Sequence, residues 1–298
     1  MTNRIRLQNE PGEGKTSKGA MLDVIKSIQD YSYNHLKKAG VRSIVLGISG
    51  GVDSALTAAL LRPVADRLGI PLIGRYIGIS TNSSEELDRA VLIGEFCTDF
   101  AIVDLGDMFD HVRAIDDNES VMPTKEHETK VRLGNIKARM RMMTLYNLAS
   151  RTGGLVLSTD NLSELNIGFW TLHGDVGDFG PIQKLWKTEV YALTDFIQQN
   201  FIDIYGPTVL SSNAMYGLIQ CIDADATDGL GITTTDLDQI TDKEFTSSQE
   251  GYKYVDDVLI AFLNNPLIVL DGKIIARHLA TDFKRAGQVN VPRFDIFN

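Results

Sequence analysis

The segment SIVLGISGGVDS, residues 43–54, joins an apolar run to a glycine-rich turn and the first residues of a helix. Its first six residues are rich in apolar and β-branched side chains, which is typical of a strand buried on both faces of a parallel sheet. Gly50 and Gly51 permit positive φ angles and a close approach of the backbone to a ligand. The segment therefore predicts a strand, a tight turn and a helix that begins at Asp53.

Strands and helices alternate on the carboxyl side of this segment, and one further helix precedes it. The expected helices span residues 20–39, 53–68, 84–96, 126–150 and 184–199, and the expected strands span residues 43–48, 71–79, 100–103 and 155–158. Pro63 should bend or divide the second helix. This alternation predicts an α/β fold: a doubly wound, mainly parallel, Rossmann-like sheet flanked by helices. Ligands of such sheets bind at the carboxyl ends of the strands, near the point where the strand order reverses.

Length and local composition suggest one large domain. The 298 residues contain no linker that would divide the chain, although the length alone allows two domains. Residues 1–19 mix charged residues with glycine and are expected to form a mobile arm, so residues 20–298 form the predicted single domain. The polar segment 223–249 is expected to be a loop that acts as a lid.

Charge and cysteine content restrict the partners. The chain has 39 acidic and 29 basic residues, a net charge of −10, and therefore lacks the overall basic character of most nucleic-acid-binding proteins. Cys97 and Cys221 are too far apart in sequence for a metal or redox motif, which favours a reducing compartment. The first twenty residues lack an apolar signal-peptide core, and the longest uncharged stretch, 204–222, is too polar to span a membrane. We therefore expect a cytoplasmic protein without nucleic-acid or membrane partners.

The glycine-rich turn has the properties of a phosphate-binding site. The N-terminus of the following helix presents free N–H groups and the positive end of the helix dipole. Ser49 and Ser54 add hydroxyl groups, and Asp53 offers a carboxylate of the kind that Mg²⁺ prefers. The turn is not a Walker A motif, because no Lys-Ser/Thr pair closes it. A glycine turn without any ligand is the alternative interpretation.

Residues 49–54 resemble the Ser-Gly-Gly-x-Asp-Ser signature of ATP pyrophosphatases, which cleave ATP between the α and β phosphates. Further segments are similar to ammonia-dependent NAD⁺ synthetases, and the resemblance extends from about residue 20 to the C-terminus. These segments are NIKARMRM (135–142) with Leu145-Tyr146, LSTDNLSE (157–164) with Gly168-Phe169 and Thr171, the stretch 174–187, and the closing Phe283-Lys284-Arg285 and Val291-Pro292.

This resemblance implies a reaction and an assembly. Members of the family activate the carboxylate of deamido-NAD⁺ with ATP, release pyrophosphate, and let ammonia convert the adenylate to NAD⁺ and AMP. No glutaminase-like domain accompanies the pattern, so free ammonia or a separate protein would supply the nitrogen. The family also forms homodimers whose interface helps to build the dinucleotide site.

The resemblance also implies roles for individual residues. Asp53 and Lys187 correspond to catalytic residues, and Asp53 and Glu164 to ligands of Mg²⁺. The expected contacts of ATP are Gly47, Ile48, Ser49, Gly50, Gly51, Val52, Asp53, Ser54, Arg75, Thr159, Lys187 and Thr227. The expected contacts of deamido-NAD⁺ are Arg139, His173, Asp178 and Lys284.

Structural alternatives exist for several of these residues. Arg75 lies inside an expected strand, where a core salt bridge would also explain it. Glu164 suits the first turn of a helix, where the dipole favours an acid. Arg139 belongs to a basic helix on which Lys130, Arg132, Lys137 and Arg141 are interpreted as surface residues, and Trp170 and Trp186 are interpreted as core. The chain departs from the family pattern at Leu172, where a lysine is common, at His173, where a tyrosine is common, and at Phe283, where a histidine is common.

Two other classes of function are left open. An ATP pyrophosphatase that adenylates a tRNA base would need a basic face and usually catalytic cysteines, which this acidic chain with two isolated cysteines does not favour. A nucleotide-binding relative without catalysis is favoured by Leu172 and Phe283. The presence of Asp53, Glu164 and Lys187 argues against that second class.

Overall fold

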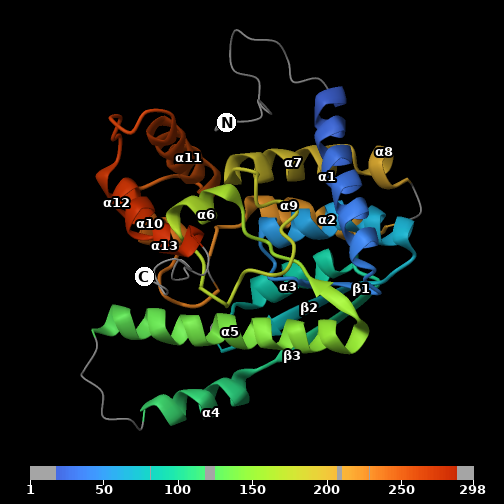
Figure 1. The fold of residues 1–298 in the computed structure, drawn as a ribbon, viewed down its shortest axis with the longest axis horizontal. Helices are drawn as coiled ribbons and strands as arrows, with labels where there is room; N and C mark the ends of the chain where they lie inside the picture. Colours follow the sequence, from blue (N-terminus) through green and yellow to red (C-terminus); the bar gives the residue numbers. More distant parts are fainter. Residues whose placement is uncertain (1–17, 81, 118–124, 207–209, 228, 287–298) are drawn as a thin grey trace, which may run out of the picture.

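A four-stranded parallel sheet lies at the centre of the computed structural model, which describes residues 18–80, 82–117, 125–206, 210–227 and 229–286 (Figure 1). The strands are β1 (Ser43–Gly47), β2 (Leu72–Gly78), β3 (Asp99–Asp104) and β4 (Gly154–Val156). Their order in the sheet is β3-β2-β1-β4, and every pairing is parallel. The predicted α/β class is confirmed. The strand order reverses between β1 and β4, so a ligand is expected at the carboxyl ends of these two strands.

Helices cover both faces of the sheet, with α5 on one side and α1, α2, α7 and α9 on the other (Figure 1). The helices of the described residues are α1 (Lys18–Ala39), α2 (Val52–Leu68), α3 (Ser84–Gly94), α4 (Gly106–Asp117), α5 (Glu126–Thr152), α6 (Leu162–Ile167), α7 (Lys187–Gln199), α8 (Phe201–Tyr205), α9 (Ser212–Asp223), α10 (Asp236–Ile240), α11 (Ser248–Asn264), α12 (Gly272–Ala280) and α13 (Asp282–Arg285). Helix α1 begins at Lys18, two residues inside the expected mobile arm, and the rest of that arm lies outside the described residues. No helix of the described part of the chain is long and apolar enough to cross a bilayer.

Strand side chains alternate between two apolar layers, as the period of two requires. Ile44 and Leu46 of β1 pack into a large cluster with α1, α2, α7 and α9. Val45 of the same strand and Val156 of β4 pack on the opposite side, against Met142 and Leu145 of α5. Burial on both faces explains why β1 is apolar at consecutive positions.

Helix α2 continues through Pro63, so it is not divided at this residue, as the sequence allowed. Proline lacks the N–H that would bond to the carbonyl four residues earlier, which here belongs to Ala59. The hydroxyl of Tyr205 on α8 donates a buried hydrogen bond of 2.8 Å to that carbonyl oxygen. Burial raises the pKa of Tyr205, so the phenol stays protonated and can donate. A distant side chain therefore replaces the hydrogen bond that the proline removes.

The segment expected to be a polar loop, 223–249, contains helix α10 and joins a second apolar cluster. This cluster gathers α6, α10, α11 and α12 around Trp186 and Tyr252. Leu237 and Ile240 are its buried members from the 223–249 segment, and Ala226 and Phe245 of the same segment pack against it partly buried. The acidic and threonine-rich composition of this segment resembles that of a surface loop. A five-residue helix also shows too little periodicity to be detected, so Leu237 and Ile240 were not recognised as core residues.

Candidate functional site

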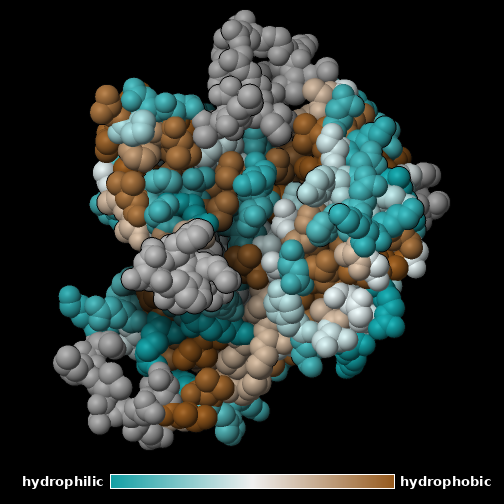
Figure 2. Space-filling model, viewed as in Figure 1, coloured by the Kyte–Doolittle hydropathy of each residue, from teal (hydrophilic) through white to brown (hydrophobic). Residues whose placement is uncertain are grey.

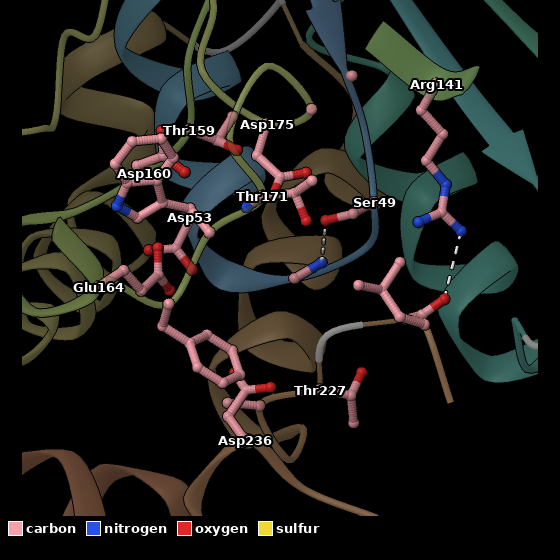
Figure 3. Close-up of a pocket in the computed structure, with 18 of the residues that line it drawn as sticks. Ser49, Asp53, Arg141, Thr159, Asp160, Glu164, Thr171, Asp175, Thr227 and Asp236 are labelled. Carbon is pink, nitrogen blue, oxygen red and sulfur yellow. Dashed lines mark hydrogen bonds between the residues drawn. The ribbon is translucent and has the colours of Figure 1, made fainter. Parts of the chain in front are cut away.

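The glycine turn lies at the carboxyl end of β1 and leads directly into α2, as predicted. Gly50 has a φ of +83°, and a Cβ at this position would lie 2.3 Å from the carbonyl oxygen of Glu86, so only glycine fits. Hydrogen bonds among the residues of the turn itself hold its shape. The Ser49 N–H donates to Ser54 Oγ at 3.3 Å, and Ser54 Oγ donates to the Gly51 carbonyl oxygen at 3.0 Å. Gly51 N–H in turn donates to Ser49 Oγ at 3.3 Å (Figure 3).

A buried lysine holds two carboxylates beside this turn. Lys187 is the first residue of α7 and is 3 % exposed, and its Nζ bonds to Asp53 Oδ2 and, at 3.1 Å, to Glu164 Oε1. Asp53 comes from the first turn of α2 and Glu164 from the first turn of α6. Figure 3 shows the two carboxylates on the same side of the cavity. The tertiary structure therefore brings together three residues that the sequence separates by up to 134 positions.

Asn161 links the two carboxylates and was missed from the sequence. Its Nδ2 donates to Asp53 Oδ1 at 2.9 Å, and its Oδ1 accepts the Glu164 N–H at 3.0 Å as the N-cap of α6. An Asn followed three residues later by Glu is a capping-box pattern, so this signal was available in the sequence. Glu164 therefore completes the cap in the first turn of α6 and also faces Lys187, while its role as a ligand of Mg²⁺ stays a prediction.

Ser163 and Asp256 fix the two helix starts that carry Glu164 and Lys187. Ser163 Oγ bonds to Asp256 Oδ1 and accepts the Lys187 backbone N–H at 2.8 Å. The other oxygen of Asp256, on α11, accepts from the Thr188 N–H at 3.1 Å. No sequence signal marked Asp256, because nothing in its local pattern distinguishes it from a surface acid of an amphipathic helix.

Burial controls the protonation of this cluster. Desolvation raises the pKa of Glu164 to about 8, against the opposing effect of the Lys187 ammonium. Burial alone would lower the pKa of Lys187, but Asp53 and Glu164 together raise it well above its usual value. Lys187 therefore stays charged, and it already has two acidic partners.

Two further acids, the buried Asp160 and the half-buried Asp175, face the cavity beside this cluster (Figure 3). Desolvation, with the Asp175 charge nearby, raises the pKa of Asp160 to about 7. Desolvation also raises the pKa of Asp175, whose carboxylate accepts the Thr171 N–H. Trp170 lines the same region, and its buried indole N–H finds no hydrogen-bond partner among the residues that the structure describes. The interpretation of Trp170 as core is wrong, whereas Trp186 is 2 % exposed in the second apolar cluster.

A cavity of about 460 Å³ connects these groups, a size typical of small-molecule sites. Most of the predicted ATP-binding residues line it, namely Gly47, Ile48, Ser49, Gly51, Val52, Asp53, Arg75, Thr159, Lys187 and Thr227. Gly50 and Ser54 do not line it and instead shape the turn. Arg75 lines the cavity and also forms an ion pair at 3.0 Å with Asp99, whose side chain is exposed, so the pair exists but does not lie wholly in the core. A contact between Arg75 and ATP stays a prediction. Thr227 Oγ1 donates to Glu86 Oε1 at 2.8 Å.

The four residues predicted to bind deamido-NAD⁺ do not lie together in the cavity. Only Lys284 lines the cavity, where its Nζ bonds to the carbonyl oxygens of Gly168, at 2.7 Å, and Trp170. Arg139 and His173 are exposed and lie outside the cavity lining, and Arg139 Nε donates to the Leu172 carbonyl at 3.3 Å. Asp178 also lies outside, accepting from Tyr146 Oη at 2.8 Å and from the Val156 N–H at 3.0 Å. Val291 and Pro292 lie outside the described residues.

Two basic residues of α5 that were interpreted as surface residues face inward. Lys137 is 4 % exposed, and its Nζ donates to the Leu230 carbonyl at 3.2 Å. Arg141 lines the cavity and donates to Asn82 Oδ1 at 2.8 Å and to the Gly229 carbonyl at 3.3 Å. The basic stripe therefore holds the segment after α9 over the cavity, which a count of charges along the helix cannot reveal.

The basic residues of α12 and α13 bind the carboxyl end of α6. Arg285 and His278 both bond to the Asn166 carbonyl, at 2.6 and 2.7 Å. Arg277 Nε donates to the Ile167 carbonyl at 3.0 Å. Carbonyl groups at the end of a helix are acceptors without intrahelical partners, and cations there are favoured by the dipole. This contact holds the short helix that carries Glu164.

A glycine turn at the switch point of a parallel sheet, next to a cavity with a buried lysine and carboxylates, defines an α/β nucleotide-binding protein. The chain belongs to the NAD synthase family, because the model of that family matches residues 24–258. A similar relative, the NH(3)-dependent NAD(+) synthetase of Campylobacter jejuni subsp. doylei, is 30 % identical over 246 residues, which cover 81 % of this chain and 91 % of the relative. The corresponding enzyme of Syntrophomonas wolfei is 34 % identical over 175 residues, 58 % of this chain and 68 % of the relative. The protein is therefore an ATP-using ligase of this family.

Solved structures show the same fold. The NMN synthetase of Francisella tularensis superposes with a TM-score of 0.69 and 22 % identity, covering 92 % of this chain and 98 % of that one. The NH3-dependent NAD synthetase of Campylobacter jejuni gives a TM-score of 0.63 at 22 % identity, with 92 % and 99 % covered. At this identity the similarity supports the fold, and the chemistry rests on the family and the site.

Proposed function

We propose that the protein catalyses the amidation of deamido-NAD⁺ by ammonia with ATP, giving NAD⁺, AMP and pyrophosphate. A carboxylate oxygen of the acceptor attacks the α-phosphorus, and the bond to the β-phosphate oxygen breaks. Ammonia then attacks the acyl carbon, AMP leaves, and a proton is released. The observation that carries the proposal is the Asp53–Lys187–Glu164 cluster beside the glycine turn, in a chain that matches the NAD synthase family over residues 24–258.

The turn and the lysine have separate tasks in this proposal. Free N–H groups at the start of α2 bind the phosphates, helped by the helix dipole. Lys187 contributes its charge where negative charge develops during cleavage. Asp53 and Glu164 keep its ammonium in place, and Asn161 orients Asp53. Arg75 and Thr159 also line the cavity, and in this proposal they contact the rest of the nucleotide.

Asp53 and Glu164 fit a magnesium site that the substrate completes. Within the described residues, no cluster of three His, Cys, Asp or Glu side chains could hold a metal. Mg²⁺, however, is usually held by one or two carboxylates together with substrate phosphates, which is the donor set that these two residues and ATP provide. When bound, Mg²⁺ would neutralise charge on the phosphates.

We also propose a homodimer that completes the acceptor site. Arg139, Met143 and Tyr146 form an exposed stripe on α5, beside the loop that carries Leu172, His173 and Asp178. Three of the four predicted dinucleotide residues therefore lie on this outer face and not in the cavity. A second copy of the chain on this stripe would enclose them. A sedimentation experiment that finds only monomer at working concentration would contradict this.

We place the enzyme in the cytoplasm. Both cysteines are free thiols, as expected in a reducing compartment. Recovery of the protein in a fraction other than the cytoplasm would contradict the assignment.

The proposal is tested with ATP, Mg²⁺, ammonium and deamido-NAD⁺, following AMP and NAD⁺ together. Equal amounts of both products are expected. AMP without NAD⁺ would indicate another acceptor, such as a tRNA base, and ATP binding without either product would indicate a non-catalytic relative. Because only Lys284 of the predicted dinucleotide residues lines the cavity, the assay is repeated with nicotinic acid mononucleotide. Faster turnover of the mononucleotide would make the smaller acceptor the substrate.

A further inference from the structure

Arg89 differs from every other basic residue of the cavity in its bonding. The lysines and arginines that line the cavity in the described part of the chain are Arg75, Arg89, Arg141, Lys187, Arg277 and Lys284. All except Arg89 bind protein acceptors through a terminal nitrogen. Arg89 donates only through Nε, to the Gly50 carbonyl oxygen at 2.8 Å. Its two terminal nitrogens donate no hydrogen bond to the residues that the structure describes.

The Nε bond acts on the glycine turn. Gly50 packs directly on α3, and Arg89 lies on the next turn of that helix. Cys221 Sγ, from α9, donates to the same carbonyl at 3.3 Å, and burial raises the pKa of this thiol to about 12, so it remains a donor. The Gly50 C=O and the Gly51 N–H belong to one trans peptide, in which the two groups point in opposite directions. Because the Gly50 carbonyl is held toward α3 and α9, the Gly51 N–H points away from these two helices.

The terminal guanidinium nitrogens of Arg89 remain available as charged donors, whereas the other cations of the cavity use terminal nitrogens to bind acceptors of the protein. Lys187 is held between Asp53 and Glu164, so its charge is already balanced. Cleavage of ATP moves negative charge onto pyrophosphate, which favours an additional cation at that end of the nucleotide. A planar guanidinium with two free NH₂ groups matches the oxygens of a phosphate in a two-point contact.

We propose that Arg89 holds the glycine turn through Nε and binds the β,γ-diphosphate of ATP through its terminal nitrogens. This role rests on the proposed function, because it takes the glycine turn as the phosphate site of ATP. Arg89 then stabilises the pyrophosphate leaving group as the bond between the α and β phosphates breaks. The residue joins Lys187 as a group that contacts the phosphates.

The test measures binding of inorganic pyrophosphate, ATP and AMP, each with Mg²⁺, by calorimetry on the full chain. Arg89→Gln should weaken pyrophosphate and ATP about 10- to 100-fold, the range of a charge-assisted hydrogen bond, while AMP changes less than about twofold. Arg89→Lys keeps one charge and should show a smaller loss with the same selectivity. Arg67→Gln, which removes an exposed arginine paired with Asp30, is the matched control and should bind all three as the parent does.

Cys221→Ala separates contact from positioning, because it removes the other bond to the Gly50 carbonyl without a change of charge. A loss as large as that of Arg89→Gln would mean that Arg89 only holds the turn, which overturns the proposal. Unchanged pyrophosphate binding by Arg89→Gln would overturn it as well, while leaving the proposed function intact. If Arg89→Gln does not fold, Arg89→Lys decides by the presence or absence of the selective loss. Absence of ATP binding in the parent would instead overturn the proposed function.

Discussion

Asp53 is the residue on which the proposed chemistry depends most directly. Its two carboxylate oxygens bond to Asn161 and Lys187, and it is the first acid of α2 next to the glycine turn. Asp53→Asn removes the proposed magnesium ligand and the charged partner of Lys187, so kcat should fall at least about 100-fold, as when a transition-state contact is lost. The initial rate of AMP formation measures this.

The matched control for Asp53 is Asp66→Asn on the same helix, where the carboxylate is half exposed and pairs with Arg62. Its rate should equal that of the parent. A normal rate for Asp53→Asn would contradict the proposed role of Asp53 as a ligand of Mg²⁺.

The raised pKa of Asp160 leads to a prediction of how the free energy of unfolding depends on pH. Its pKa in the folded protein is about 7, above the usual 3.8, so the folded state binds this proton more tightly than the unfolded state. The free energy of unfolding should therefore fall as the pH rises from about 4 to 7, by at most about 4 kcal/mol for this group. Asp160→Asn removes the effect, and the variant should gain stability relative to the parent between pH 5 and pH 8 in urea unfolding without Mg²⁺.

An exposed carboxylate provides the comparison for Asp160. Asp257→Asn, which changes a surface pair with Lys253, should follow the parent at both pH values. A constant difference between Asp160→Asn and the parent at pH 5 and pH 8 would show that Asp160 is not the titrating group.

At the scale of elements, the continuity of α2 through Pro63 depends on α8. Tyr205→Phe leaves the buried Ala59 carbonyl without its hydrogen bond, which should cost about 1–3 kcal/mol of unfolding free energy. In a Pro63→Ala background the helix supplies its own N–H, so the same change should cost less than about 1 kcal/mol. Thermal or urea unfolding of the four proteins of this cycle measures the difference.

The control for this cycle is Tyr216→Phe, at a tyrosine that is 52 % exposed, which should leave stability unchanged. Equal costs of Tyr205→Phe in both backgrounds would mean that the hydroxyl does not replace the missing helical bond.

At the scale of the whole molecule, exposed apolar side chains indicate where other chains bind. Figure 2 shows brown side chains at the corner formed by α11 and α12, where Leu267, Val269 and Leu270 are exposed. The stripe on α5 differs from this corner because it adjoins residues with predicted roles in binding. Oligomeric state is therefore best tested on α5.

The parent should sediment with about twice the 32.9 kDa of one chain. Met143→Glu places a charge on a residue that is 51 % exposed in the stripe, and it should shift the protein to the monomer because burying an unpaired charge is costly. Ile202→Glu, at a similarly exposed position on α8, should remain a dimer. Dissociation by both variants, or by neither, would contradict an interface on this stripe.

Local patterns predicted the elements of the sheet because their signals are local. The apolar runs and the spacing of helical faces placed β1, β2, β3, α2, α3, α5 and α7 within a few residues of their bounds. The glycine turn was also evident, since its positive φ requires glycine. The sequence pattern did not predict α4, α6 or α8–α13, several of which are short or owe their apolar face to the second cluster.

The sequence therefore determined the residue types at the glycine turn. It also determined the alternation of elements that places this turn after a buried strand. Which side chains meet there was set by packing, because Asp53, Asn161, Glu164 and Lys187 come from separate elements. The same is true of Arg89 and Lys137, whose direction depends on which helix face turns to the cavity. A sequence shows the period of a helix, but the neighbours that bury one face are brought there only by the fold.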